Sequence, residues 1–335
     1  MPEGHFIEFG GAITRADWTN ALWRRQRDVG IQKASAVVES QPTPPINEEY
    51  FEWVDLLEAI ESAQGQFVMV ELGAGYGRWS VHGALAARAA GLEAHCVAVE
   101  AEPTHARWIR QHFIDNELLP SDHELLWAAI GPESGFVPFG IGLSRTCYSR
   151  EVVKRTEAPF PNAAERRTLR ARSVLGRPPR VPSERSGSMW VPALALVDVL
   201  APYPIIDLLD LDVQGAELVV LSAAIRRLNA RVRRVHIGTH GAVPGVEDGL
   251  RELFTKHRWT CRHDFAAGTV VDTPYGQVEF ADGVQSWINN DVGRLEAGPA
   301  TPDAAELVRS QEQVLLLKQR IGTLKAKMRA RAHSQ

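Results

Sequence analysis

One segment constrains the fold of this chain more than any other. An apolar run leads into an acidic residue and then a turn with glycine at every second position, Val68-Met-Val-Glu-Leu-Gly-Ala-Gly-Tyr-Gly77. Glycine tolerates positive φ and carries no side chain, so backbone in such a turn can approach a ligand closely. The pattern predicts a β-strand, a ligand-binding turn and a helix. An ordinary tight turn between strand and helix is the alternative interpretation.

The residues around the turn favour S-adenosylmethionine over a dinucleotide. The dinucleotide fingerprint places a third glycine at position 78, where this chain has Arg78. A carboxylate such as Glu71 is a poor neighbour for a pyrophosphate but a good acceptor for an ammonium group. Glu100 follows one strand-helix-strand unit later, where doubly wound folds hold ribose hydroxyls, and Ala129 is expected to line the adenine pocket. The predicted cofactor-binding residues are Glu71, Gly73, Ala74, Gly75, Tyr76, Gly77, Glu100, Ala101 and Ala129.

Composition sets broad limits on the class of protein. The chain has 335 residues, of which 44% are hydrophobic, enough for one large α/β domain with appendages or for two smaller domains. Its net charge of -4 and the absence of interleaved aromatic and basic residues argue against a nucleic-acid partner. Three widely spaced cysteines, no signal-peptide pattern and no long apolar run predict a cytoplasmic protein without a transmembrane segment.

Strand and helix patterns alternate through most of the chain. We expect strands at 67–72, 95–100, 124–130, 205–211 and 232–238, and helices at 78–90, 103–115, 215–228 and 246–257. An earlier helix follows Asn47, with Phe51, Val54, Leu57 and Ile60 at a spacing of three. This βαβ repetition predicts an α/β fold, a Rossmann-like doubly wound, mainly parallel sheet. Two short segments around Thr-Pro-Tyr-Gly276 predict an antiparallel hairpin at the sheet edge.

The predicted domain at 47–290 carries three additions. Residues 1–46 contain a predicted helix, 17–38, and a proline-rich linker. An arginine-rich insertion, about 144–190, holds eleven basic and four acidic residues, and is expected to be a lid, a disordered excursion or a docking patch. Residues 303–335 predict a C-terminal helix, either a single amphipathic helix or a coiled coil that pairs subunits or recruits a partner enzyme.

The candidate catalytic residues are Asp212 and His240. Strand 205–211 delivers Asp210 and Asp212 to one side at its carboxyl end, and Asp212 is expected where the acceptor meets the transferred methyl group. His240 ends the next strand and is interpreted as a general base, a metal ligand or a structural residue. A divalent ion held by Asp212 and His240 is a weaker form of this hypothesis. Glu217, in the first turn of the next helix, either supports the site or complements the helix dipole.

These motifs resemble the FkbM-like family of class I S-adenosylmethionine-dependent methyltransferases. The resemblance covers about residues 47–290, and its most specific part is Asp207-Leu-Leu-Asp-Leu-Asp-Val-Gln-Gly-Ala-Glu217. The chain departs from the family pattern at Gln214, where glutamate is usual, and at Asp210, where lysine is common. The resemblance implies a Rossmann-like domain and methyl transfer to oxygen, often on a sugar or a natural-product hydroxyl.

The resulting hypothesis is an O-methyltransferase that acts on a saccharide or natural-product hydroxyl. The arginine-rich insertion suggests an anionic, phosphate-linked carrier for the acceptor, because guanidinium groups clamp phosphate. Two alternatives remain at this point. One is a non-catalytic assembly or scaffold protein that keeps the fold, and the other is a nicotinamide-dependent oxidoreductase.

Overall fold

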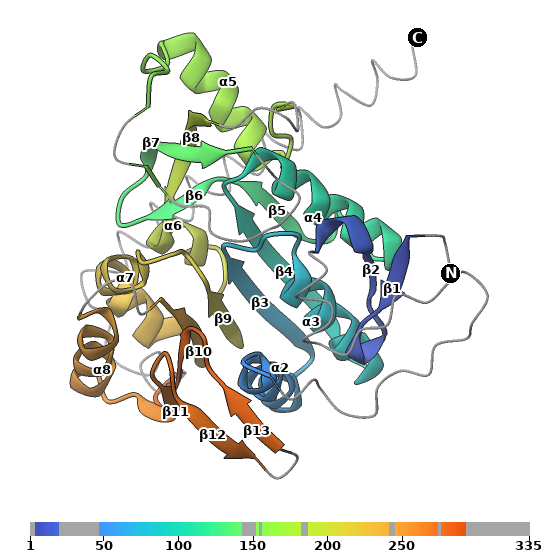
Figure 1. Ribbon diagram of the computed structural model, residues 1–335, viewed down its shortest axis with the longest axis vertical. Helices are drawn as coiled ribbons and strands as arrows, with labels where there is room; N and C mark the ends of the chain where they lie inside the picture. The colour runs from blue at the N-terminus through green and yellow to red at the C-terminus, as the bar shows by residue number, and fades with distance from the viewer. Residues whose placement is uncertain are drawn as a thin grey trace.

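A seven-stranded sheet forms the centre of the protein (Figure 1). The structure, a computed structural model, describes residues 4–19, 47–142, 152–153, 156–181, 187–240, 245–273 and 276–292. Within these residues the strand order is β11-β14-β10-β9-β3-β4-β5. The strands are β3 (Gln66–Leu72), β4 (Glu93–Glu100), β5 (Glu124–Trp127), β9 (Leu208–Leu211), β10 (Arg234–Thr239), β11 (Thr260–Phe265) and β14 (Gly283–Ile288). All are parallel except β14, which runs antiparallel to β10 and β11.

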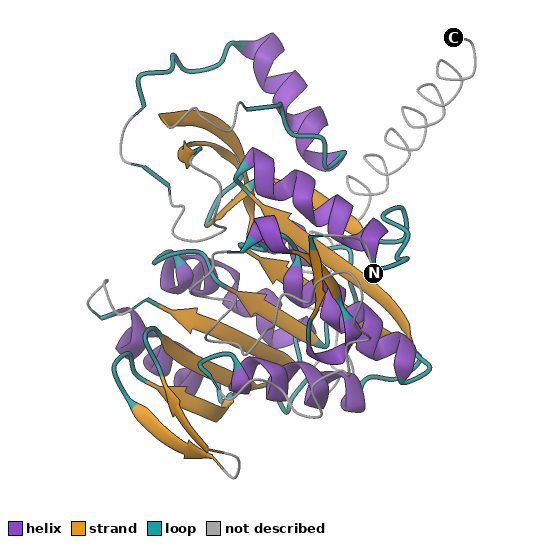
Figure 2. Cartoon of the chain, turned by 45° about the vertical axis from the view of Figure 1, so that its right-hand side comes forward, coloured by secondary structure: helices purple, strands orange, loops and turns teal. Residues whose placement is uncertain are grey.

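Helices cover both faces of this sheet (Figure 2). One face packs on α2 (Tyr50–Ser62), α3 (Arg78–Ala89) and α4 (Pro103–Asp115). The other packs on α6 (Leu196–Leu200), α7 (Glu217–Arg231) and α8 (Val246–Lys256). Burial on both faces explains why β3 and β4 read as nearly continuous apolar runs. The predicted mainly parallel, doubly wound α/β fold is confirmed by this arrangement.

The connections create a switch point between β3 and β9. From β3 the chain moves through β4 to β5 on one side, and after the insertion it returns to β9 on the other side of β3. Ligands of open α/β sheets bind outside the carboxyl ends of the strands at such a point. The topology therefore places the glycine turn after β3 beside the end of β9.

The insertion contains more regular structure than the sequence suggested. The strand predicted at 124–130 is split, because Ala128 separates β5 from β6 (Ala129–Gly131). β6 belongs to a second sheet of order β6-β8-β7, with β7 (Gly135–Ile141) and β8 (Gly187–Ala195). Between β7 and β8 the chain forms α5 (Ala163–Val174), which Asn162 and Glu165 cap reciprocally.

The predicted hairpin forms, but it does not close the sheet edge as expected. β12 (Val270–Thr273) and β13 (Gly276–Glu279) pair antiparallel as a separate two-stranded sheet. The edge of the main sheet is β11, paired with β14. The edge-hairpin prediction was wrong on this point because the strand that follows the hairpin, β14, inserts between β10 and β11.

The amino-terminal extension packs against α3 and α4. Its described part is a hairpin of β1 (His5–Ile7) and β2 (Ile13–Arg15) with two short 3₁₀ turns, η1 (Phe9–Gly11) and η2 (Ala16–Trp18). The helix predicted over 17–38 overlaps η2 and otherwise lies outside the described residues, as does the C-terminal helix predicted over 303–335. No helix in the described parts is long and apolar enough to span a membrane.

A buried carboxylate ties α2 to the sheet. Asp55 is fully buried, and it accepts hydrogen bonds from Arg234 at 2.5 Å and from Ser286 at 2.7 Å. Its other oxygen lies 2.7 Å from Nδ1 of His236. Arg234 also pairs with Glu58, a partly exposed residue one turn further along α2. Asp55 therefore holds α2 on β10 and β14.

Removing Asp55 should destabilise the protein much more than removing Glu58. Asp55→Ala leaves buried donors unpaired and should lower the free energy of unfolding by roughly 3–5 kcal/mol. Glu58→Ala breaks a partly solvated pair and should cost no more than about 1 kcal/mol. Urea denaturation of both variants measures the two losses. Equal losses would contradict the role assigned to Asp55.

Candidate active site

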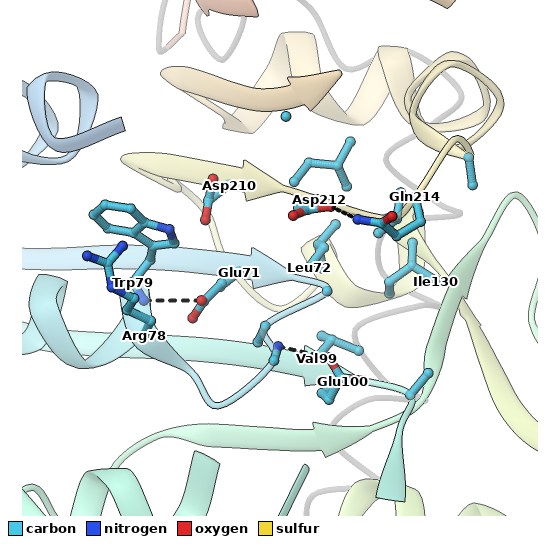
Figure 3. A pocket seen from close by; sticks show the side chains of 18 of the residues that line it. Glu71, Leu72, Arg78, Trp79, Val99, Glu100, Ile130, Asp210, Asp212 and Gln214 are labelled. Atoms are coloured by element: carbon cyan, nitrogen blue, oxygen red, sulfur yellow. Dashed lines mark hydrogen bonds between the residues drawn. The ribbon is translucent and has the colours of Figure 1, made fainter. Parts of the chain in front are cut away.

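A cavity of about 420 Å³ opens at the carboxyl ends of β3, β4, β9 and β10 (Figure 3). Most of the predicted site residues line it: Glu71, Gly73, Ala74, Gly75, Tyr76, Glu100, Ala101, Ala129, Asp212 and His240. Gly77 does not line the cavity; it precedes the first residue of α3. The fold thus brings most of the predicted cofactor and catalytic residues, from β3, β4, β6 and the ends of β9 and β10, into one cavity.

The glycines of the turn serve contacts within the protein as well as access for a ligand. Gly73 has φ +79°, and a Cβ there would lie 1.8 Å from the carbonyl oxygen of Asp212. Gly77 has φ +73°, and its Cβ would meet Ile109 at 2.8 Å. Only glycine fits both the backbone conformation and the space at these positions. The turn can therefore pack directly against the end of β9.

Glu71 points from β3 toward the amino end of α3. Its two oxygens accept hydrogen bonds from the backbone N–H groups of Trp79 at 3.1 Å and Ser80 at 2.8 Å. These contacts favour the charged form, but burial and the neighbouring charge of Asp210 outweigh them and raise the pKa of Glu71 to about 8. A cation beside Glu71 would relieve this penalty.

Glu100 closes the turn from the end of β4. Its carboxylate accepts hydrogen bonds from Gly75 N at 2.8 Å and Glu102 N at 2.6 Å. Burial raises the pKa of Glu100 to about 8. The backbone N–H of Ala101 is a third donor to Glu100, and a carboxylate offers about four lone-pair sites, so Glu100 keeps capacity for one further hydroxyl donor. Beyond it the cavity wall is apolar, formed by Val99, Ala101, Ala129, Ile130 and Phe139.

Arg78 contributes a positive charge at the edge of the cavity. Its Nε donates to Glu8 of the amino-terminal hairpin at 2.6 Å, and Nη1 lies 3.0 Å from Glu49. The guanidinium also stacks on Trp79, 4.4 Å from the ring centre. The arginine that breaks the dinucleotide fingerprint is thus a buried anchor between the hairpin and α3.

The catalytic candidates meet at the end of β9 and β10. Nε2 of His240 lies 3.3 Å from Oδ1 of Asp212, and Nδ1 lies 3.3 Å from Oε1 of Glu217. Glu217 also accepts a hydrogen bond from Gly215 N at 3.0 Å. It therefore both satisfies the turn before α7 and holds His240, so the two interpretations of Glu217 are compatible.

Gln214 is a residue of this group whose role the sequence left open. Its φ of +55° turns its side chain back toward the cavity, and its amide nitrogen lies 2.8 Å from Asp212 and 2.7 Å from Nε2 of His240. The amide can donate to His240 only when Nε2 carries no proton. Burial disfavours the imidazolium, but the contacts with Glu217 and Asp212 outweigh burial and raise the pKa of His240 to about 9.

Three further polar residues lie deeper in the cavity. Asp210 pairs in register with Glu71 on β3 and with His236 on β10. Glu71, Asp210 and His236 therefore form a row across the sheet. Glu52 reaches the row from α2 and shares a hydrogen bond with Asp210. Sequence reasoning placed Asp210 beside Asp212; it missed Glu52, which no motif marks.

The comparisons with known proteins agree with this geometry. The profile of the FkbM methyltransferase domain matches residues 71–258, which is more than half of the chain. The chain belongs to the FkbM methyltransferase family. The predicted family is therefore confirmed, and with it the assignment to the class I S-adenosylmethionine-dependent methyltransferases.

One curated relative carries the same activity in its name. This FkbM-family chain is 24% identical over 213 residues to a protein of Jannaschia sp. (strain CCS1) named "Putative methyltransferase", covering 64% of this chain and 69% of the relative. Solved structures with a similar course of chain include the precorrin-6y C5,15-methyltransferase of Geobacter metallireducens GS-15, with 11% identity, coverage of 77% and 94%, and a TM-score of 0.37. The methyltransferase domain of METTL16 has 12% identity, coverage of 86% and 87%, and a TM-score of 0.38.

The side chains of the cavity fit the cofactor that this family implies. The buried carboxylate of Glu71 suits the cationic methionine part of S-adenosylmethionine. Glu100 has acceptor capacity for a ribose hydroxyl, and the apolar wall that includes Ala129 suits the adenine ring. The acidic and apolar parts of the cavity therefore follow the same order as the methionine, ribose and adenine parts of the cofactor.

Alanine at position 73 should damage the site more than alanine at another left-handed glycine. Gly91 has φ +77°, and a Cβ added there would have no heavy atom within 4 Å, so Gly91→Ala should cost only the backbone strain of about 1–2 kcal/mol. Gly73→Ala adds the clash with Asp212 and should cost a further 1–3 kcal/mol, roughly, in unfolding free energy. Thermal denaturation compares the two variants, and similar losses would contradict the close approach of turn and β9.

The raised pKa of His240 can be measured directly. In the cofactor-free protein the ring should titrate near pH 9 by ¹⁵N-histidine NMR, and Gln214→Glu should raise the pKa further by adding a carboxylate beside Nε2. The folded-state pKa exceeds the ordinary value of 6.5. The contribution of His240 to the free energy of unfolding is therefore complete below pH 6.5 and is lost as the pH rises through about 9. A ring that titrates near 6.5 would refute the two-carboxylate environment.

Proposed function

We propose that this protein transfers the methyl group of S-adenosylmethionine to a hydroxyl oxygen. The observation that carries the proposal is the position of His240, whose imidazole is held between Asp212 and Glu217 at the open end of the sheet. Because the pKa of His240 is raised to about 9, the ring can take the proton that an attacking hydroxyl must lose only in its neutral form, whose share grows as the pH rises toward 9. His240, the base for the acceptor, and the carboxylates that would bind the cofactor come from neighbouring strands of the sheet.

The cofactor residues orient the methyl donor. Bound S-adenosylmethionine supplies an electrophilic methyl group on a sulfonium. Glu71 and the glycine turn hold the methionine part, Glu100 holds the ribose, and Ala129 with Ile130 packs on the adenine. Alignment of this kind is a major part of catalysis for an in-line displacement, because the two reacting atoms must meet at a fixed angle and distance.

His240, Asp212 and Gln214 handle the acceptor proton. The hydroxyl oxygen forms a bond to the methyl carbon while the carbon–sulfur bond breaks with its electron pair passing to sulfur, and the hydroxyl proton passes to Nε2 of His240. Gln214 donates to Nε2 of the neutral ring and must release it to the hydroxyl, and Asp212 and Glu217 stabilise the imidazolium after the transfer. General base catalysis of this type contributes typically ~10²–10⁴-fold.

The acceptor in this proposal is a saccharide or natural-product hydroxyl, on an anionic, phosphate-linked carrier. The first part rests on the family resemblance. The second rests on the basic residues of the insertion, of which Arg166, Arg167, Arg170 and Arg172 lie on α5. This helix lies beside the β6-β8-β7 sheet, whose Phe139 and Ile130 line the cavity.

Direct titration tests the cofactor part of the proposal. Calorimetry with S-adenosylhomocysteine should show binding in the micromolar range, NAD should show none, and Glu100→Ala should lose about 1–3 kcal/mol of binding free energy because the ribose loses its acceptor. Glu61→Ala, a surface carboxylate on α2, serves as the matched control and should bind normally.

Methyl transfer tests the catalytic part. With labelled S-adenosylmethionine and a panel of saccharides and phosphate-linked saccharides, His240→Gln should bind the cofactor normally but transfer methyl groups at least about a hundredfold more slowly. Unchanged turnover would remove His240 from the mechanism. Cofactor binding without transfer to any acceptor, together with a dispensable Asp212, would favour the scaffold alternative.

A further inference from the structure

A polar row crosses the floor of the cavity and is not explained by the catalytic group. Glu71, Asp210 and His236 are register partners on the adjacent parallel strands β3, β9 and β10, so their side chains point to the same face of the sheet. Asp210 and His236 are both buried, and Glu52 covers them from α2. The row lies two residues before the level of Gly73 and Asp212, on the inner side of the cavity.

Three of these side chains place ligand atoms close together. One donor atom from each of Glu52, Asp210 and His236 lies within 4.8 Å of the other two. Metal ligands in proteins bind at about 2.0–2.2 Å, so donor atoms on opposite sides of one ion are about 4.2 Å apart. Small rotations of the Glu52 and Asp210 carboxylates would bring the three donor atoms to this spacing.

His236 is oriented as a metal-binding histidine is. Its Nδ1 lies 2.7 Å from Oδ2 of Asp55, which is itself held by Arg234 and Ser286. Its Nε2 makes no hydrogen bond to any residue that the structure describes, although the residue is only 3% exposed and lines the cavity. A carboxylate behind the imidazole fixes the ring and increases its basicity toward an ion on the other nitrogen.

The nearby positive charge is already engaged. The guanidinium of Arg78 pairs with Glu8 and Glu49, although its charge also acts on Glu52. Glu52 and Asp210 instead face each other across a shared hydrogen bond, with Glu71 as the next carboxylate along the row. The arrangement concentrates carboxylates around one imidazole nitrogen.

We propose that Glu52, Asp210 and His236 bind a divalent transition-metal ion at the floor of the cavity. One imidazole and two carboxylates form a donor set suited to Mn²⁺ or Zn²⁺. This site differs from an ion held by Asp212 and His240, because it uses the deeper residue of each of the two strands and a ligand from α2. Its chemical role rests on the proposed function: an ion at this depth, below Asp212 and His240, would stabilise the charged form of the buried carboxylates beneath the reacting groups.

Titration with Mn²⁺ alone tests the binding. The full-length protein is treated with a chelator, and free Mn²⁺ is then counted by electron paramagnetic resonance as MnCl₂ is added. We expect one ion per chain, with affinity at least about tenfold weaker in Glu52→Gln and in Asp210→Asn. Glu48→Gln removes another carboxylate from the cavity lining and should leave the affinity unchanged. Circular dichroism confirms that each variant is folded, and Glu52, on the partly exposed face of α2, is the substitution least able to disturb the core.

Several results would overturn the proposal. These are the absence of stoichiometric Mn²⁺ binding, wild-type affinity in Glu52→Gln, or a loss confined to Asp212→Asn and His240→Gln. Weaker binding of S-adenosylhomocysteine in Glu52→Gln with unchanged Mn²⁺ affinity would assign the three residues to the cofactor's ammonium group instead. Cofactor binding and methyl transfer without Mn²⁺ binding would refute the ion site alone, whereas Mn²⁺ binding without methyl transfer would refute the proposed function alone.

Discussion

The register between β3, β9 and β10 is the constraint on which the rest of the structure depends. It aligns Glu71 with Asp210 and Asp210 with His236, and it brings the next layer, Gly73 and Asp212, into contact at the open edge. Side chains alternate between the faces of a strand, so a slip of one residue in β9 would turn both aspartates toward α6 and α7. The backbone hydrogen bond from Asp212 to Leu72 and the absence of a side chain at position 73 hold this register at the site itself.

The same register concentrates negative charge where water is scarce. Burial raises the pKa of Glu71 and of Glu100 to about 8, and that of Asp210 to about 6. A protein retains such groups when a ligand compensates for their lost hydration, and perturbed carboxylates in a cavity are typical of functional sites. A sulfonium cofactor and a metal ion are two cations that would stabilise the charged carboxylates, at different depths of the same cavity.

Much of the fold could be predicted from the sequence because strand and helix periods are local signals. The boundaries of α3 and α4, and of β3 within one residue, follow from apolar periodicity and from glycine and proline at their ends. Periodicity placed the buried face of α2 only in part: Phe51 and Ile60 are buried, but Leu57 is exposed. The buried face is turned toward Trp53 and Leu56, because the helix also buries Asp55. Splitting of the strand at Ala128 and insertion of β14 beside β10 depend on pairings between distant segments, which local patterns do not report.

The sequence by itself determined that the chain is an α/β methyltransferase, that a glycine turn follows the first strand, and that Glu71, Glu100, Asp212 and His240 end strands. These conclusions hold because strand ends in a parallel sheet share one edge. Only the tertiary structure decided which of these groups touch. It placed Glu217 and Gln214 on His240, packed Gly73 against Asp212, and brought Glu52 from α2 over Asp210 and His236. Contacts between residues so far apart in the sequence depend on strand order, register and helix packing together, and no single segment encodes them.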